Sequence, residues 1–111
     1  MNVYYINSLV LLTVMRFKIK SIKPKKEEVM NYITINLDQE LTNDQFQTSI
    51  KHITESGILI NDSDGYDVHI GLWHIYVEIL QYNDLNNTKE NLKIVENRIK
   101  TLEDKVKNRK S

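Results

Sequence analysis

The stretch Leu41–Ile60, LTNDQFQTSIKHITESGILI, carries the start and stop signals of one helix. Thr42 and Gln45 have the spacing of a capping box, in which each side chain accepts a hydrogen bond from the other residue's backbone N–H. Three apolar residues then recur at helical spacing, namely Phe46, Ile50 and Ile53. Gly57 supplies the left-handed residue that ends many helices. The stretch therefore predicts a helix over residues 43–56 with a polar outer face.

Length and composition predict one small domain. The chain has 111 residues and 41% hydrophobic content, enough for a modest core. It has no cysteine, which excludes a disulfide framework, a thiolate metal site and a thiol nucleophile, and which fits a cytoplasmic protein. Alanine is absent while Ile, Lys and Asn are abundant, a bias typical of AT-rich coding sequences and hence of a low-GC bacterium, its phages or its plasmids.

The net charge is zero, but acidic and basic residues lie in different segments. Residues 38–78 contain eight acidic residues against Lys51 alone. The segment 16–26 contains no acidic residue and six basic ones: Arg16, Lys18, Lys20, Lys23, Lys25 and Lys26. Such asymmetry predicts either a charged surface for a partner or two parts of the chain that complement each other.

The segment Val3–Met15 is apolar but short of the ~20 residues that span a bilayer, so we expect no membrane span. It also lacks the basic start of a signal peptide. A buried strand or short helix is the expected structure, with an export-like segment or a poorly ordered extension as alternatives. The segments 16–22 and 32–38 both alternate apolar and polar residues, which predicts two half-exposed strands.

Turn residues after the helix predicted at 43–56, which we call the anchor helix, predict a β-hairpin. Asp64-Gly65 suits a two-residue type I′ loop between short strands at about 58–60 and 66–70. Residues 72–80 fit either period, since the apolar residues can line one side of a strand or one side of a helix. Their β-branched and aromatic content favours a strand.

From Leu85 onward, apolar residues recur every seven positions, with the a and d spacing of a coiled coil. This pattern predicts a C-terminal amphipathic helix that pairs with itself or with another protein. Its apolar seam would consist of Leu92, Val95, Ile99, Leu102 and Val106. In a parallel dimer Arg98 would meet Glu103 of the second copy. Three heptads are marginal alone, so packing of the same stripe on the chain's own sheet stays open.

No motif for chemistry stands out. Three scattered glycines cannot form a phosphate-binding loop, and the histidines lack metal-ligand spacing. The acidic hairpin resembles a calcium loop superficially, but two key oxygen ligands are missing. With a two-residue loop at Asp64-Gly65, Asp62 would pair with Asp67, and the two carboxylates would repel each other. A bound cation or a longer loop would relieve that repulsion. We expect no catalytic residue, no cofactor, no metal site and no enzyme activity.

A helix that ends in Ser56-Gly57 and runs into a hairpin resembles the end of a winged helix-turn-helix. The resemblance implies that Leu41–Ser56 is the recognition helix and Asn61–Tyr66 the wing. The residues also argue against it, because the preceding segment reads as a strand where a supporting helix is needed. Lys51 is the one basic residue of the supposed recognition helix, so phosphate contacts would have to come from the basic segment 16–26.

These patterns predict an α+β fold: a small antiparallel-leaning sheet, one helix packed on it at 43–56, and a long C-terminal amphipathic or coiled-coil helix. The expected organisation is an apolar N-terminal segment at 1–15, a domain at 16–82 and the C-terminal helix at 83–111. The expected function is a non-enzymatic interaction or assembly protein that associates through the C-terminal helix. The alternative is a winged-helix-like DNA-binding regulator that uses the basic segment.

Overall fold

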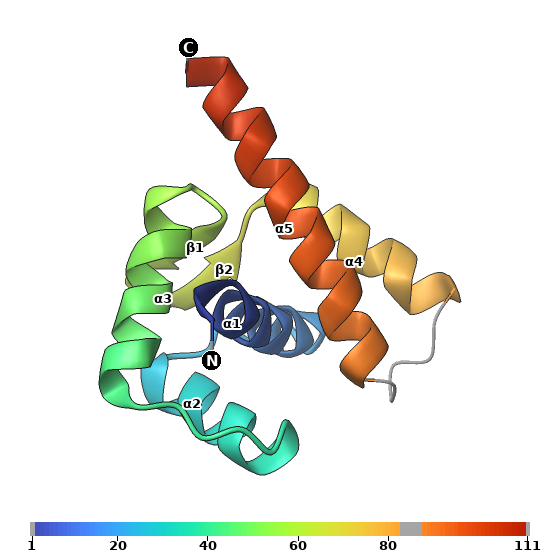
Figure 1. Ribbon diagram of the computed structural model, residues 1–111. Coiled ribbons are helices and arrows are strands. Elements are labelled where there is room, and N and C mark those ends of the chain that lie inside the picture. Colours follow the sequence, from blue (N-terminus) through green and yellow to red (C-terminus); the bar gives the residue numbers. More distant parts are fainter. Residues whose placement is uncertain (1, 83–87, 111) are drawn as a thin grey trace.

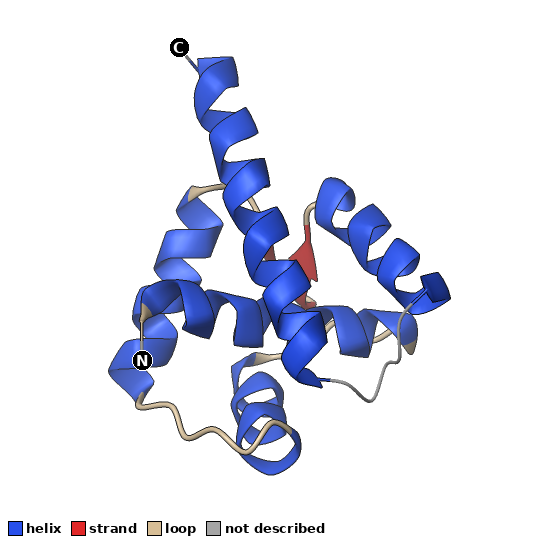
Figure 2. Ribbon diagram, turned by 45° about the vertical axis from the view of Figure 1, so that its right-hand side comes forward, coloured by secondary structure: helices blue, strands red, loops and turns tan. Residues whose placement is uncertain are grey.

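The computed structural model describes the backbone of residues 2–82 and 88–110, and side chains at 2–74, 76–77 and 89–101. Within these ranges five helices enclose a core and one two-stranded hairpin completes the fold (Figure 1). The elements follow the chain as α1 (Val3–Ile19), α2 (Lys26–Asn36), α3 (Asn43–Glu55), β1 (Leu59–Asp62), β2 (Gly65–Val68), α4 (Ile70–Tyr82) and α5 (Thr88–Lys110). Figure 2 shows how small the hairpin is beside the helices.

The centre of the fold is α1. Every residue from Ile6 to Met15 is buried, because α2, α3, α5 and β2 all pack around this helix (Figure 1). A helix that is apolar on all sides is stable only in such an enclosed position. Its buried hydroxyls are satisfied locally, since Thr13 donates to the Leu9 carbonyl at 2.8 Å and Ser8 donates to that of Tyr5 at 2.7 Å. No described helix is long and apolar enough to cross a membrane.

The anchor helix of the sequence is confirmed as α3. Thr42 Oγ1 accepts from the Gln45 N–H at 3.1 Å, and Gln45 Oε1 accepts from the Thr42 N–H at 2.9 Å. At the other end the Ile58 N–H donates to the Ile53 carbonyl while Gly57 adopts φ +79°, which together make a Schellman ending. The predicted apolar stripe is buried: Phe46, Ile50 and Ile53.

The hairpin also exists, but its register differs from the prediction. Asp62 pairs with Gly65, so the two-residue loop is Ser63-Asp64 and not Asp64-Gly65. Asp67 consequently pairs with Ile60, which removes the expected repulsion between Asp62 and Asp67. No cation and no longer loop is needed to explain this turn.

The predicted α+β fold class is wrong, because the chain is mostly helical. The predicted strand at 16–22 is largely the end of α1, and the predicted strand at 32–38 belongs mainly to α2. Burial decides α2: the residues at helical spacing are covered, whereas Ile35, which the strand pattern places inside, is 77% exposed. The covered residues are Val29, Ile33 and Leu37.

The strand preferred for 72–80 is wrong for a similar reason. These residues belong to α4, and the helical pair Leu72 and Tyr76 is fully buried. In α5, side chains are described from Lys89 to Thr101, which is 13 residues, so the predicted long coiled-coil helix is not shown. The expected boundary after residue 15 falls inside α1, whose residues on both sides of it belong to one continuous helix.

Candidate interaction surfaces

The basic segment and the acidic hairpin face each other. Lys18 Nζ lies 2.8 Å from an oxygen of Asp67, and Lys23 Nζ lies 2.7 Å from an oxygen of Asp62. The backbone joins the same two parts, since the Tyr66 N–H donates to the Pro24 carbonyl at 2.8 Å. Of the two explanations for the uneven charge, the structure therefore supports complementarity within the chain for these four side chains.

These ion pairs change the proton affinities of both partners. The hydrogen bond from Lys23 lowers the pKa of Asp62, with help from the Asp64 N–H, while the same contact raises the pKa of Lys23. Burial is the largest single influence on Asp67 and acts to raise its pKa. The hydrogen bonds from Lys18 and from the Val68 N–H, together with the charges of the nearby lysines, outweigh burial, and the pKa falls. Both carboxylates thus stay ionised beside a lysine. In the described residues no three His, Asp or Glu side chains converge as a metal site would require.

The rest of the predicted nucleic-acid set is dispersed. Arg16 Nη1 donates to the Tyr32 hydroxyl at 3.0 Å, inside the fold's α1–α2 contact. Lys26 Nζ donates to Asn43 Oδ1 at 2.6 Å and links the starts of α2 and α3. Lys20 and Lys25 are exposed. Four of the six basic side chains thus contact other parts of the chain: Arg16, Lys18, Lys23 and Lys26.

In the structure a helix precedes α3 and a hairpin follows it. The supporting helix that the sequence lacked is present as α2, which removes the first objection to the winged-helix resemblance. The second objection grows stronger. From residue 25 to residue 69 the chain has three lysines against nine acidic residues, a net charge of −6. Phosphate contacts depend on Lys and Arg, so this part of the fold would repel a duplex.

Three of the five residues of the predicted C-terminal seam are used inside the chain. Leu92, Val95 and Ile99 are buried in the common core, where α5 packs on α1 and α4. Arg98 is exposed on the outside of the helix. The remaining predicted contacts lie outside the described side chains: Leu102, Glu103 and Val106.

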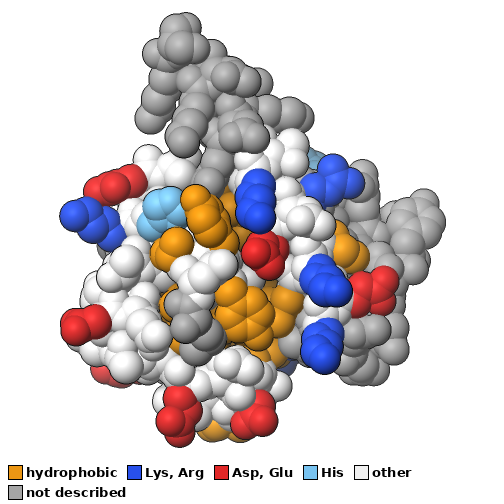
Figure 3. All heavy atoms as spheres, in the orientation of Figure 1, with side chains coloured by type: hydrophobic (Ala, Val, Ile, Leu, Met, Phe, Trp, Pro, Cys, Tyr) orange, Lys and Arg blue, Asp and Glu red, His pale blue; other side chains and the backbone are white. Residues whose placement is uncertain are grey.

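A surface that the sequence did not reveal lies opposite this seam, where α3 and α5 flank the start of α1. Tyr4 is at its centre and is 39% exposed. Its ring makes an edge contact with His52 of α3, with 5.9 Å between centroids, and Lys100 Nζ of α5 lies 5.7 Å above it. Figure 3 shows apolar side chains between the two helices, with charged side chains of both signs on either side and more Lys and Arg on the side away from α3.

Helical spacing assigns the residues on each side. On α3 the stripe that contains His52 also carries Asp44, Thr48 and Glu55, since these residues recur every three or four positions. On α5 the corresponding stripe is Lys89, Lys93, Glu96 and Lys100. These eight residues and Tyr4 form what we call the dipolar face. The sequence analysis identified neither stripe as a surface, because only the assignment of residues 3–19 to one helix brings Tyr4 between α3 and α5.

A buried polar network fixes α1 against α3 beneath this face. Ser49 Oγ donates to Asn7 Oδ1 at 2.6 Å, and Asn7 Nδ2 lies 2.7 Å from His52 Nδ1. Asn7 and Ser49 are fully buried. Because buried polar groups are costly without partners, the network specifies how the two helices meet and so positions the His52 ring against Tyr4.

Comparison with known proteins adds no family. No protein-family model matches the chain, and no curated protein or solved structure matches it.

Proposed function

We propose that this is a non-enzymatic interaction protein that self-associates through the dipolar face. The observation that carries the proposal is the surroundings of a half-exposed aromatic side chain: Tyr4 touches His52 of α3 and Lys100 of α5, with the exposed carboxylates of Asp44 and Glu55 on α3 and an excess of lysine on the α5 stripe. Protein interfaces typically have an aromatic centre and a charged rim. Asp44, Glu55 and the three lysines of the α5 stripe are all exposed, which leaves their charges available to a partner.

A second copy of the chain complements this face. In a two-fold symmetric pair the same patch is used by both copies, so a contact between α3 of one copy and α5 of the other occurs twice. An axis near Tyr4 brings Asp44 and Glu55 of each copy toward Lys93 and Lys100 of the other. Glu96 reduces the positive charge of the α5 stripe but does not cancel its three lysines.

Charge reversal tests this arrangement. One double variant carries Asp44→Lys and Glu55→Lys, and the other carries Lys93→Glu and Lys100→Glu. Sedimentation velocity over a concentration series should show dimers for the wild type and weaker association for each variant alone. An equimolar mixture of the two variants should recover association, because every contact between unlike copies is again between opposite charges.

The control for Lys93→Glu with Lys100→Glu is Lys20→Glu with Lys25→Glu. It makes the same change in net charge, at exposed lysines outside the dipolar face. This control should associate like the wild type. A wild-type chain that stays monomeric at all concentrations contradicts the proposal, and so does a variant mixture that behaves as the sum of its components.

Duplex DNA binding is the second candidate, favoured by the helix order and by the position of α3 before a hairpin. Binding would depend on exposed lysines near the start of α2 and would weaken steeply between about 50 and 200 mM salt. Fluorescence anisotropy with a labelled duplex measures this. We expect no salt-dependent binding; binding that Lys25→Gln and Lys26→Gln abolish would favour the DNA-binding function instead.

A further inference from the structure

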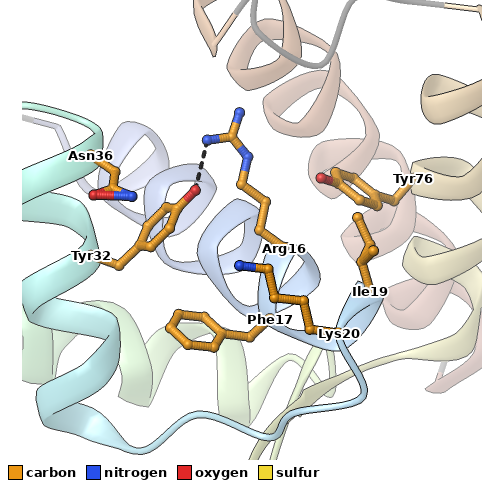
Figure 4. Close-up of a pocket in the computed structure, with 7 residues that line it drawn as sticks. All are labelled: Arg16, Phe17, Ile19, Lys20, Tyr32, Asn36 and Tyr76. Carbon is orange, nitrogen blue, oxygen red and sulfur yellow. Dashed lines mark hydrogen bonds between the residues drawn. The ribbon is translucent and has the colours of Figure 1, made fainter.

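A pocket of about 440 Å³ lies where the end of α1 meets α2 and α4, away from the dipolar face and sharing no residue with it. Figure 4 shows its seven lining residues, with the Arg16 side chain between the rings of Tyr32 and Tyr76. The volume falls in the range of pockets that hold small organic molecules. Because the pocket and the dipolar face share no residue, ligand binding in the pocket would be independent of the proposed self-association.

The lining combines positive charge with hydrogen-bond donors. Arg16 and Lys20 contribute cationic groups from α1, Asn36 contributes an amide from α2, and none of the seven lining residues is acidic. Tyr32 accepts a hydrogen bond from Arg16 at 3.0 Å, so its own hydroxyl proton is directed away from Arg16 and can be donated elsewhere. Phe17 and Ile19 supply apolar wall.

The Tyr76 hydroxyl is the least satisfied group of this pocket. It is buried and makes no hydrogen bond of acceptable geometry with any described residue. Burial raises the pKa of Tyr76, and the Arg16 guanidinium, which acts on the hydroxyl oxygen both as a charge and as a donor, opposes that rise only in part, so the hydroxyl keeps its proton and remains a donor. A buried hydroxyl proton that lacks an acceptor costs about 1–3 kcal/mol, which a bound acceptor would recover.

We propose that this pocket binds a small organic anion that has one carboxylate or phosphate head and an apolar ring. The head lies against Lys20 and Arg16 and accepts from the hydroxyls of Tyr32 and Tyr76. The ring packs against Phe17 and Ile19 near the end of α1. An ionised oxygen is the acceptor that matches two cations and two hydroxyl donors.

Nuclear magnetic resonance titration of the full chain tests the proposal with four probes: benzoate, phenyl phosphate, neutral benzamide and inorganic phosphate. We expect benzoate or phenyl phosphate to shift the amide signals of the pocket residues, and benzamide and inorganic phosphate to bind at least tenfold more weakly. Whichever anion binds identifies the head group. Tyr76→Phe keeps the ring in the core and should weaken binding about fivefold or more, and Lys20→Gln about tenfold.

Lys51→Gln is the control, since it removes an exposed lysine of α3 that does not line the pocket. It should bind like the wild type. The proposal is overturned if benzamide binds as tightly as benzoate, if inorganic phosphate binds as tightly as phenyl phosphate, or if Tyr76→Phe and Lys51→Gln behave alike. Absence of any shift at about 10 mM of both organic anions overturns it as well.

Discussion

Replacing Gly65 with alanine tests how closely the hairpin sits on the connection between α1 and α2. Gly65 has φ +138°, and a Cβ at this position would lie 2.5 Å from the Lys23 carbonyl oxygen and 2.7 Å from that of Pro24. Both neighbours are backbone atoms, and the Pro24 carbonyl also accepts the Tyr66 N–H at 2.8 Å. An alanine must therefore push the hairpin off the connection.

The free energy of unfolding should fall by about 2–4 kcal/mol. A non-glycine residue in this backbone region costs about 1–3 kcal/mol, and loss of the hydrogen bond from Tyr66 adds about 1 kcal/mol. In a domain of this size such a loss lowers the melting temperature by roughly 10–20 °C. The ion pair between Lys23 and Asp62 would also be pulled apart, but both side chains are exposed and we assign it no energy.

Gly57→Ala is the matched comparison. Gly57 also has a positive φ, +79°, but a Cβ there meets nothing within 4 Å. Its cost is the left-handed conformation alone, about 1–2 kcal/mol. Urea unfolding followed by circular dichroism should give a clearly larger loss for Gly65→Ala than for Gly57→Ala. Equal losses would refute the close approach of the hairpin to the connection.

Three further predictions concern the core and its ion pairs. Asn7→Ala removes the amide that joins α1 to α3 and strands the buried Ser49 hydroxyl, so it should cost about 2–4 kcal/mol in urea unfolding, against about 1–2 for Ser49→Ala. Ile99→Ala should lower the free energy of unfolding by about 2–5 kcal/mol at every protein concentration, because Ile99 is buried within the chain. Its control, Arg98→Ala at an exposed position, should lower it by less than about 0.5 kcal/mol. A loss for Ile99→Ala that depends on protein concentration would contradict packing inside the chain. Because the folded-state pKa of Asp67 is lowered, its contribution to stability is present above the ordinary carboxyl pKa of about 3.9 and is lost as the pH falls below it. Asp67→Asn should therefore reduce the loss of stability on acidification, measured as the urea midpoint at neutral and acidic pH.

The helix α3 could be predicted from sequence because its signals are local. The cap, the apolar stripe and the Schellman glycine all lie within one short stretch, and each determines its own hydrogen bonds without help from the rest of the chain. The predicted Thr42–Gln45 contacts and the Gly57 conformation are therefore confirmed atom by atom.

The other helices could not be predicted in this way because their short apolar runs fit two periods. In 32–38 the alternation of Ile33, Ile35 and Leu37 reads as a strand, yet the buried pair Ile33 and Leu37 is equally a helical i, i+4 pair. Isoleucine is β-branched and favours the prediction of a strand, and this alanine-free chain uses isoleucine where many helices have other apolar residues. Tertiary burial of Val29 on the same side decides for the helix.

The sequence of the segment 3–15 is also ambiguous between a helix and a strand. A fully enclosed helix has no polar face, so its sequence lacks the amphipathic period that identifies surface helices. Asn7 and Thr13 are polar residues within this apolar run, and each is satisfied inside the fold, one by α3 and one by its own helix. Only the arrangement of the surrounding helices distinguishes this helix from a buried strand.

The same arrangement constrains any self-association through α5. The seven-residue pattern correctly indicates that one side of this helix needs cover, and Val95 and Ile99 receive it from the chain itself. A coiled-coil pairing through those residues would require α5 to leave α1 and expose the core. A partner of the folded chain must instead contact the outer side, where Lys93 is exposed and Lys100 lies over the Tyr4 ring. Recovery of association in the charge-reversed mixture, with Ile99 still buried, is the result that separates these two modes.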